Sequence, residues 1–424
     1  MSKRAQKSQA GENPQSVAGG DYHYPQEKRV IIFTSVGHAM MHVFELIYAG
    51  VLPLLIIQFD LTLAQAGLLV FPNLLMLGLG SLPAGLLSDR WDSHKVFLLF
   101  FFGTSASAIL IGLSVTIWQL VLAFGLMGLF ASLYHPTGLA MISLGVRRKG
   151  LIMGVHGIFG SLGLAVSPFL AGLLGEMFGW QWAFFIPALA GVAIGVALLF
   201  FPIHSNRHHA DRHREYAKQN NPDTAKKTSN SNNRKVLFWL YGVMIIAGFV
   251  YRGLMTYLPK YLGENIQVSW IGSSVVAGGL FVSLVLVFGG LGQIWSGHRT
   301  DRIDSFRFYV RLVPFYMPLL LVTSMLSGYP LVAGLCVFQF FFFSSQPIEN
   351  QMLAQATPVR YRSTGYGLKF TLNLGIGALA APVCGWIGDI WGMQWIFYFL
   401  SLVLVLAAAG AFGIHRAHQS AAAG

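Results

Sequence analysis

The feature that most constrains this chain is a series of apolar stretches, each long enough to cross a lipid bilayer. Roughly 20 apolar helical residues span a hydrocarbon core about 30 Å thick, and stretches of that length recur between short polar breaks. Only 10% of the 424 residues are charged, against about 25% in soluble proteins. We therefore expect an all-α membrane protein with twelve transmembrane helices, near 30–57, 62–87, 96–114, 118–144, 150–175, 180–202, 236–262, 270–296, 308–327, 331–356, 363–388 and 392–414.

The net charge of +12 is concentrated on one side of these predicted helices. Lysines and arginines gather in the N-terminal segment, in every second loop and in the polar segment 203–235, whereas Lys260 is the only cation in the intervening loops. Loops rich in Lys and Arg stay in the cytoplasm, so both termini and 203–235 are predicted to be cytoplasmic. The basic excess thus reflects topology and does not indicate a nucleic-acid partner.

The chain ends and the cysteines give two further expectations. Residues 1–29 are polar and precede an apolar run that is too long for a signal-peptide core, which predicts an uncleaved cytoplasmic tail. Residues 415–424 form a second cytoplasmic tail. Cys336 and Cys384 both lie within apolar stretches, so we expect two buried thiols and no disulfide framework.

An internal repeat divides the chain into two halves. GLLGEMFGWQW at 172–182 returns as GWIGDIWGMQW at 385–395. The pattern Gly80-x4-Gly85-x3-Asp89-Arg90-x4-Lys95 likewise returns as Gly292-x4-Gly297-x3-Asp301-Arg302-x4-Arg307. Ordered motifs repeated at nearly one shift predict two pseudo-symmetric six-helix domains, 30–202 and 236–414, joined by the linker 203–235.

The segment GLLSDRWDSHK at 85–95 resembles the signature loop of the major facilitator superfamily, and its copy in the second half extends the resemblance. The resemblance implies a cytoplasmic gate. In such a gate we expect Gly85 to allow close helix approach and Asp89 to face the start of the eleventh helix, near Ser363 and Thr364. A merely stabilised tight turn is the alternative. The predicted gate residues are Gly85, Asp89, Arg90, Lys95, Gly297, Asp301, Arg302 and Arg307.

The fifth stretch resembles the glycine-rich antiporter motif of the superfamily's efflux members, with Ser167 and Ala171 replacing two of its glycines. Such spacing gives a smooth helix face for packing between the halves, although small-residue packing unrelated to transport direction is the alternative. The predicted packing residues are Gly154, Gly163, Pro168 and Gly172. In the fourth stretch, Phe124 occupies the place of an intramembrane arginine of proton-coupled drug antiporters, which excludes coupling by that residue.

Several short motifs also resemble the fosmidomycin-resistance branch of the superfamily, mainly in the first half. They are Gly37-His38, Leu52-Pro53-Leu54-Leu55, Ser132-Leu-Tyr134-His135-Pro136 and Arg148-x-Gly150. This resemblance implies a bacterial inner-membrane exporter of a small, polar or anionic toxic compound.

Ionisable residues inside the predicted helices are candidates for function, because a bilayer makes them costly. His38, His42 and Glu45 follow one another at i, i+4 and i+7 and so lie on one stripe of the first helix. A rise of 1.5 Å per residue places Glu45 ~22 Å from the cytoplasmic end and Arg252, on the seventh helix, ~24 Å. We expect Glu45 and Arg252 to pair in one transport state and separate in the other, with an isolated static pair as the alternative.

Further intramembrane candidates lie nearer the cytoplasmic side. Glu349 and Lys369 are expected to form a second pair. His135 could satisfy a carbonyl freed by Pro136, and His156 could lie near the headgroups. Histidine titrates near neutral pH, so His38, His42 and His135 with Glu45 are candidates for a proton path. Zinc binding by the His-x3-His-x2-Glu stripe is a weaker alternative because no further ligand cluster is evident, and we expect neither metal nor cofactor.

These observations predict a secondary transporter that works by alternating access, as a monomer, on a small molecule and protons, with the bilayer as its surroundings. No Gly-x4-Gly-Lys-Ser/Thr nucleotide loop is present. The alternatives are a proton symporter that imports an organic solute, a transport-inactive sensor, and a membrane-embedded enzyme. The 33-residue linker is too short for a sensor's output domain. The sequence shows no arrangement of a nucleophile, a base and an oxyanion site that would indicate an enzyme.

Overall fold

The computed structural model describes residues 26–146, 149–203, 231–266, 268–269, 271–300, 302–357 and 362–422. Within these ranges the chain is almost entirely helical and has no strand. Twelve helical segments are long and apolar enough to span a membrane. The predicted all-α membrane fold with twelve transmembrane helices is therefore confirmed.

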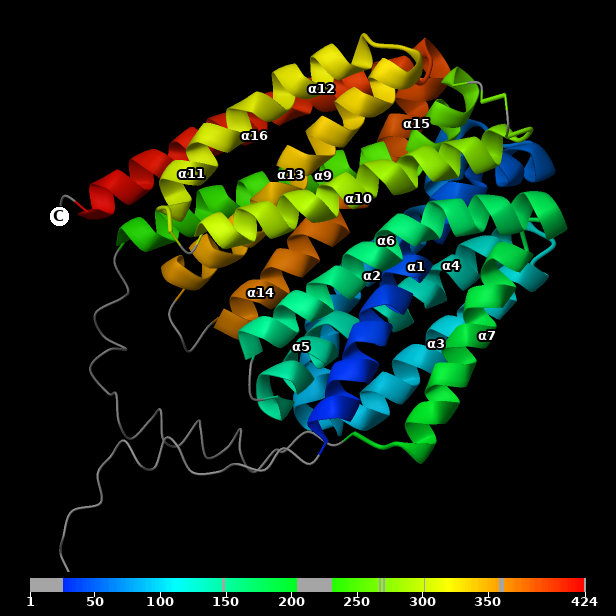
Figure 1. The fold of residues 1–424 in the computed structure, drawn as a ribbon, viewed down its shortest axis with the longest axis horizontal. Coiled ribbons are helices and arrows are strands. Elements are labelled where there is room, and N and C mark those ends of the chain that lie inside the picture. Colours follow the sequence, from blue (N-terminus) through cyan, green and yellow to red (C-terminus); the bar gives the residue numbers. More distant parts are fainter. Residues whose placement is uncertain are drawn as a thin grey trace, which may run out of the picture.

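The helices form two bundles that lie side by side, one for each half of the chain (Figure 1). The N-terminal bundle consists of α1 (Glu27–Phe59), α2 (Leu63–Arg90), α3 (Ser93–Leu113), α4 (Ile117–Ala131), α5 (Tyr134–Gly145), α6 (Lys149–Phe178) and α7 (Trp182–Phe200). The C-terminal bundle consists of α9 (Ser231–Asn265), α10 (Ser274–Thr300), α11 (Ser305–Leu312), the 3-10 helix η1 (Val313–Phe315), α12 (Tyr316–Ser324), α13 (Gly328–Ala356), α14 (Arg362–Phe370), the π-helix η3 (Thr371–Ile376), α15 (Ala380–Trp391) and α16 (Gln394–Ala422).

Three of the predicted spans are interrupted rather than continuous. The fourth is divided between α4 and α5, where Pro136 occupies the first turn of α5 and its missing N–H requires no partner. The ninth contains η1, with a proline in its first turn. The eleventh passes through the π-helix η3, whose Asn373 side chain donates 2.7 Å to the Met244 carbonyl of α9. Such π segments are frequent at functional sites, and this one lies where the bundles meet: a methyl group at Gly78 of α2 would lie 2.2 Å from the Gly375 nitrogen of η3.

Two helix ends differ from the predicted boundaries. Helix α9 begins at Ser231, inside the predicted linker, and α16 continues to Ala422, through most of the predicted C-terminal tail. Both segments are polar, so the apolar pattern used to predict the spans covers less of the chain than the helices do. The predicted N-terminal tail up to residue 25 and the linker from 204 to 230 lie outside the described residues.

The two bundles are in tight contact at one end of the molecule, which we call the closed end. It contains the α1–α2, α6–α7 and α15–α16 turns, and its backbones approach closely. A methyl group at Gly279 of α10 would lie 2.5 Å from the Pro168 carbonyl oxygen of α6. The Asp389 carboxylate of α15 accepts hydrogen bonds from the backbone N–H groups of Leu63 (2.8 Å) and Ala64 (2.9 Å), at the start of α2. Asp389 thus caps a helix of the opposite half.

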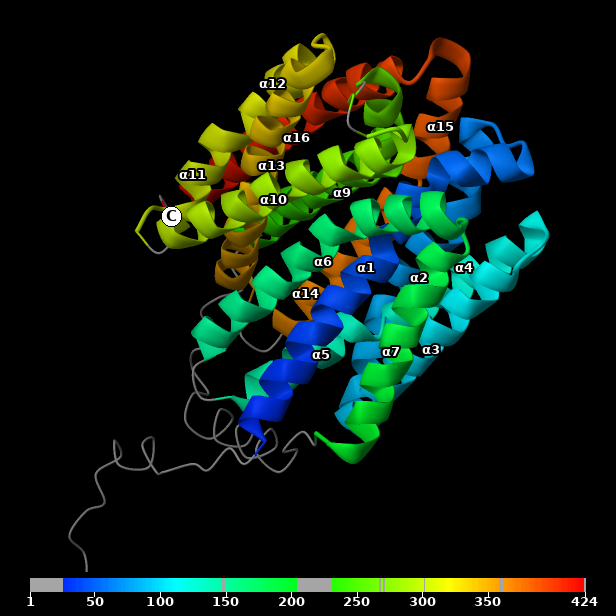
Figure 2. The same ribbon diagram turned by 45° about the vertical axis from the view of Figure 1, so that its right-hand side comes forward.

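The other end, which we call the basic end, contains the start of α1 and the α2–α3 and α10–α11 turns. Here a cleft separates α6 from α10, with about 1570 Å³ of empty space including the part open to the outside. A methyl group at Gly154, Gly157 or Gly297 would meet no atom within 4 Å. Figure 2 shows the two bundles together near α15, at the closed end. Among the described residues, the structure is open at the basic end between α6 and α10.

Candidate functional site

Glu45 and Arg252 form an ion pair between the two halves. Glu45 belongs to α1, Arg252 belongs to α9, and Arg252 Nη2 lies 2.6 Å from Glu45 Oε1. Both side chains are buried, at 5% and 3% relative exposure. The pairing expected from equal depth on the two helices is present, and because each partner belongs to a different bundle, a rocking motion of the halves would change their separation.

The second carboxylate oxygen of Glu45 is shared with a histidine of its own helix. His42 Nδ1 lies 2.5 Å from Glu45 Oε2. One carboxylate therefore contacts a cation of the opposite half through one oxygen and a titratable ring of its own half through the other. This arrangement can link the protonation of the histidine to the position of the halves.

Three more histidines gather around His42. His38 Nε2 lies 3.1 Å from His42 Nε2, and the ring of His156 stacks on His38 with centroids 4.0 Å apart. The His135 ring meets both His38 and His42 edge-on, at 5.4 Å and 5.6 Å. The structure thus brings α1, α5 and α6 together in one imidazole cluster, which we call the histidine cluster: His38, His42, His135 and His156.

The histidine cluster bears on the sequence-based expectations for its members. His156 faces the inside of the protein: it is only 3% exposed and stacks on His38. His135 stacks on Phe370 of α14, with centroids 4.9 Å apart, so it touches the opposite half. Ring nitrogens of His38, His42 and His135 lie within 4.8 Å of one another, so the three histidines grouped from the sequence as a candidate proton path are neighbours in the structure.

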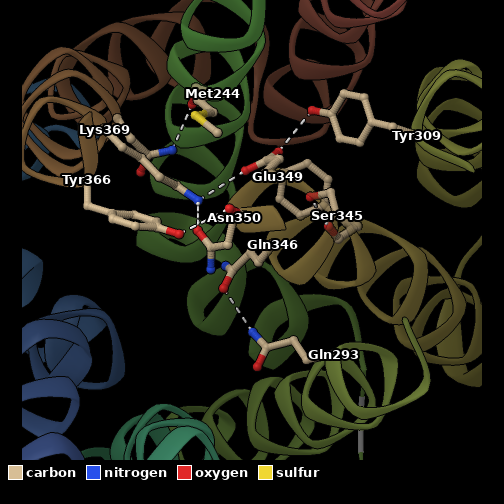
Figure 3. A network of polar contacts seen from close by, with 11 residues as sticks. Met244, Gln293, Tyr309, Ser345, Gln346, Glu349, Asn350, Tyr366 and Lys369 are labelled. Atoms are coloured by element: carbon tan, nitrogen blue, oxygen red, sulfur yellow. Dashed lines mark hydrogen bonds and ion pairs between the residues drawn. The ribbon is translucent and has the colours of Figure 1, made fainter. Parts of the chain in front are cut away.

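Glu349 and Lys369 form the second expected pair, and here both partners belong to the C-terminal bundle. Lys369 Nζ lies 3.4 Å from Glu349 Oε2 and donates 2.8 Å to Asn350 Oδ1. Tyr309 Oη donates 2.9 Å to Glu349 Oε1. Figure 3 shows the Glu349 side chain between Lys369 and Tyr309. We call this group the C-terminal network; it joins α11, α13 and α14 inside one bundle.

A chain of amides connects this region to the cleft. Gln293 of α10 donates 3.0 Å to Gln346 Oε1 of α13, and Ser161 of α6 donates 3.3 Å to Gln293 Oε1. Gln346 faces Gln293 just below the C-terminal network in Figure 3. Ser161 and Gln293 belong to different halves, so they form a polar contact inside a cleft whose lining is otherwise mostly apolar.

The predicted gate residues lie at the basic end. Arg90, Lys95, Arg302 and Arg307 are exposed there, while Asp301 and the side chains of Asp89 and Ser363 lie outside the described part of the chain. Gly85 makes only an ordinary contact, since a methyl group there would lie 3.7 Å from Pro136 Cβ. The close approach expected at Gly85 occurs at Gly80, the first glycine of the same motif, where a methyl group would lie 2.3 Å from Ser132 Oγ.

The glycine-rich motif of α6 has several packing partners. A methyl group at Gly163 would lie 2.3 Å from the Ala39 carbonyl oxygen, within the N-terminal half. At Gly172 it would lie 2.9 Å from the Val275 carbonyl oxygen of the other half, next to the contact of Pro168 with Gly279. Gly154 lines the open cleft instead. Packing between the halves therefore belongs to the closed-end part of the motif only.

Some residues of these contacts were not singled out from the sequence. Tyr134 stacks on His38 and its hydroxyl donates to the Thr34 carbonyl. Asn350 is the nearest partner of Lys369, and Asp389 bridges the halves. Signals existed for two of them: Tyr134 belongs to the Ser132-Leu-Tyr134-His135-Pro136 motif, and the repeat aligns the segment of Asp389 with the one containing Glu176.

Comparison with known proteins defines the class of this chain. The sequence profile of the Major Facilitator Superfamily matches residues 34–382, and the chain belongs to that superfamily. Its fold is similar to the crystal structure of a bacterial homolog to the human lysosomal transporter Spinster in an inward-facing and unoccupied conformation. That similarity has a TM-score of 0.77 at 15% identity, and covers 93% of this chain and 98% of that one.

Relatives among characterised sequences include two that are named for resistance. The multidrug resistance protein MdtG of Proteus mirabilis is 22% identical over 335 residues, which is 76% of this chain and 78% of that protein. The tetracenomycin C resistance and export protein of Streptomyces glaucescens is 32% identical over 146 residues, 33% of this chain. The chain spans only 27% of that exporter's length. The fold, the family and the relatives define a multi-pass membrane transport protein.

Proposed function

We propose that this protein is a proton-coupled secondary transporter that exports a small polar or anionic compound by alternating access. The observation that carries the proposal is the Glu45 carboxylate, which contacts Arg252 of the opposite half at 2.6 Å and His42 of its own half at 2.5 Å. A proton arriving at the histidines and a movement of Arg252 both change the charge balance at the same carboxylate. Proton binding and rocking of the halves are thereby coupled.

An anionic group on the substrate is supported by the spare donors of Arg252. A guanidinium carries five N–H donors, and Arg252 Nε is buried without a hydrogen-bond acceptor among the described residues. A carboxylate or phosphonate entering between the halves would satisfy such donors. The mostly apolar cleft leading from the basic end suits the remaining part of a small molecule.

Export is supported by the names of two relatives and by the resemblance of α6 to the antiporter motif. The local resemblance to the fosmidomycin-resistance branch points the same way. The concentration of lysines and arginines at the basic end supports an inner-membrane orientation with both termini cytoplasmic, and a single chain contains the whole candidate site, so a monomer suffices. Import by proton symport is the second candidate, and the direction of proton flux separates the two.

Substrate-driven proton flux in proteoliposomes tests this proposal. Purified protein is reconstituted with a fluorescent pH reporter, and small phosphonates, organic acids and cationic drugs are added in turn. We expect one compound class to drive proton movement in the wild type and not in Glu45→Gln. Flux opposite to the substrate indicates antiport, and flux in the same direction indicates symport. Solute transport that persists without proton movement would overturn the coupling.

A further inference from the structure

The two imidazole rings on α1 face each other through the same type of nitrogen. His38 and His42 lie one helical turn apart, with ring centroids separated by 4.8 Å and their Nε2 atoms by 3.1 Å. A contact this short between ring nitrogens requires a proton or another cation between them, because two lone pairs at that distance repel. The state of each ring therefore depends on which of its nitrogens already carries a hydrogen.

The partners of the other two ring nitrogens determine this state. His42 Nδ1 meets Glu45, a carboxylate that also pairs with Arg252, at 2.5 Å. His38 Nδ1 meets the backbone carbonyl oxygen of His156 at 2.7 Å. A carboxylate and a carbonyl oxygen only accept hydrogen bonds, so both Nδ1 atoms donate. If both rings were neutral, both Nε2 atoms would then present lone pairs to each other.

We propose that His38 and His42 share one additional proton between their Nε2 atoms, and that this pair is where the transporter holds its coupling proton; the assignment of the coupling role rests on the function proposed above. The proton is bonded to one Nε2 and hydrogen-bonded to the other. It arrives from water on one side of the membrane and leaves to water on the other, and no other bond is made or broken. The pair of rings thus carries one positive charge.

The distances favour a proton over a metal ion. The separation of 3.1 Å suits an N–H···N hydrogen bond. Zinc bound tetrahedrally at about 2.0–2.1 Å would hold two nitrogens roughly 3.3 Å apart, and a third ligand would have to be equally near. The candidate ligand atoms of the three histidines spread over as much as 4.8 Å. A metal would therefore need a third histidine to move closer, whereas a shared proton needs no side chain to move.

The charged and titratable groups around the pair explain how the proton would be released. Glu45 on the same helix favours it, and Arg252 of α9 opposes it by competing for Glu45. His135 and Tyr134 of α5 and His156 of α6 complete the ring of titratable neighbours. When the halves separate at the closed end, Arg252 moves away and the proton is held more tightly. When the halves close, as in this structure, Arg252 competes for Glu45. The proton is then held less tightly and can leave toward the open basic end.

Counting protons in the purified full-length protein tests the shared site without any substrate. Proton uptake between about pH 8 and pH 5 is measured for wild type, His38→Asn, His42→Asn and the double variant. An asparagine places an amide nitrogen near the position of Nδ1, so the contacts with Glu45 and the His156 carbonyl are retained while Nε2 is removed. We expect each single variant and the double variant to lose the same single proton.

Two independent sites would instead lose one proton in each single variant and two in the double variant, which would overturn the proposal. Equal uptake by all four proteins would also overturn it. His415→Asn on α16, outside the histidine cluster, is the matched control: His42→Asn should still remove one proton when it is made in that background. Stoichiometric Zn²⁺ binding by calorimetry that disappears in His38→Asn, with no shared proton, would assign the site to a metal.

The proton count and the flux experiment can fail separately. If the proton is shared but no substrate drives proton flux, the shared site stands and the proposed transport coupling is contradicted. If flux is lost in Glu45→Gln but the two histidines titrate independently, the proposed transport function stands and the shared proton is contradicted.

Discussion

The two buried ion pairs of this transporter are built differently. Glu45 and Arg252 join the two bundles, whereas Glu349 and Lys369 both belong to the C-terminal bundle and move together. The proposed rocking of the halves would change the first pair and could leave the second intact. The comparison teaches that depth and burial are not sufficient to identify a coupling residue: the decisive property is whether its partner belongs to the other moving body.

The largest effect is expected at the pair that crosses between the halves. Arg252→Ala leaves the Glu45 carboxylate buried without its cation, which costs about 3–5 kcal/mol of folding stability and abolishes coupled transport. Thermal unfolding in detergent and proteoliposome flux measure the two effects. The double variant Glu45→Gln/Arg252→Gln should recover most of the stability but none of the coupling. Normal flux in Arg252→Ala would show that the Glu45–Arg252 pair is not needed for coupled transport.

A smaller effect is expected where the closed end is most tightly packed. Gly279→Ala would bring a methyl group 2.5 Å from the Pro168 carbonyl oxygen, and overpacking of this kind costs about 1–3 kcal/mol. The state that holds Glu45 against Arg252 should therefore become less populated. Gly154→Ala is the matched control, since nothing lies within 4 Å of its added methyl group. Accessibility of single cysteines at the closed end to a thiol reagent should rise in the first variant only.

The capping contact at the closed end should contribute less. Asp389→Asn removes the negative charge and one acceptor from the start of α2, and a lost helix cap typically costs about 1 kcal/mol. Cysteine accessibility at the closed end should rise by several-fold, with transport retained. An unchanged accessibility would show that Asp389 does not hold the halves together.

The smallest effect is expected for the pair inside the C-terminal bundle. Replacing both members, as Glu349→Gln/Lys369→Met, removes two opposite charges together, so stability should change little. Substrate-driven proton flux should stay within about threefold of the wild type, a difference of about 0.6 kcal/mol. Loss of proton coupling in this double variant, with the protein folded, would place a coupling group in the C-terminal network and break the contrast between the two pairs.

Much of this arrangement was predictable from the sequence, because the bilayer imposes helix length and the repeat aligns the halves. Equal depth on α1 and α9 was sufficient to match Glu45 with Arg252. Depth says nothing about the rotation of a helix, so the packing of His156 on His38 could be learned only from the structure.

The irregular backbone segments also could not be predicted from the hydropathy pattern. Apolar periodicity continues through the break between α4 and α5 and through the π-helix η3, so hydropathy could not reveal either. The relation between His38 and His42 was visible as one helical stripe. The partners that fix their hydrogens, an ion-paired carboxylate and the carbonyl of His156, depend on the packing of three helices.

The most direct test of the central claim is a distance measured between the halves at the closed end. Spin labels at Ile57 of α1 and Trp391 of α15, which are 79% and 54% exposed, would be placed in a background without Cys336 and Cys384. Pulsed electron paramagnetic resonance then compares Arg252→Gln with Lys369→Gln. We predict that a longer distance becomes more populated in Arg252→Gln and not in Lys369→Gln. Equal changes in both variants, or no change in Arg252→Gln, would contradict the account.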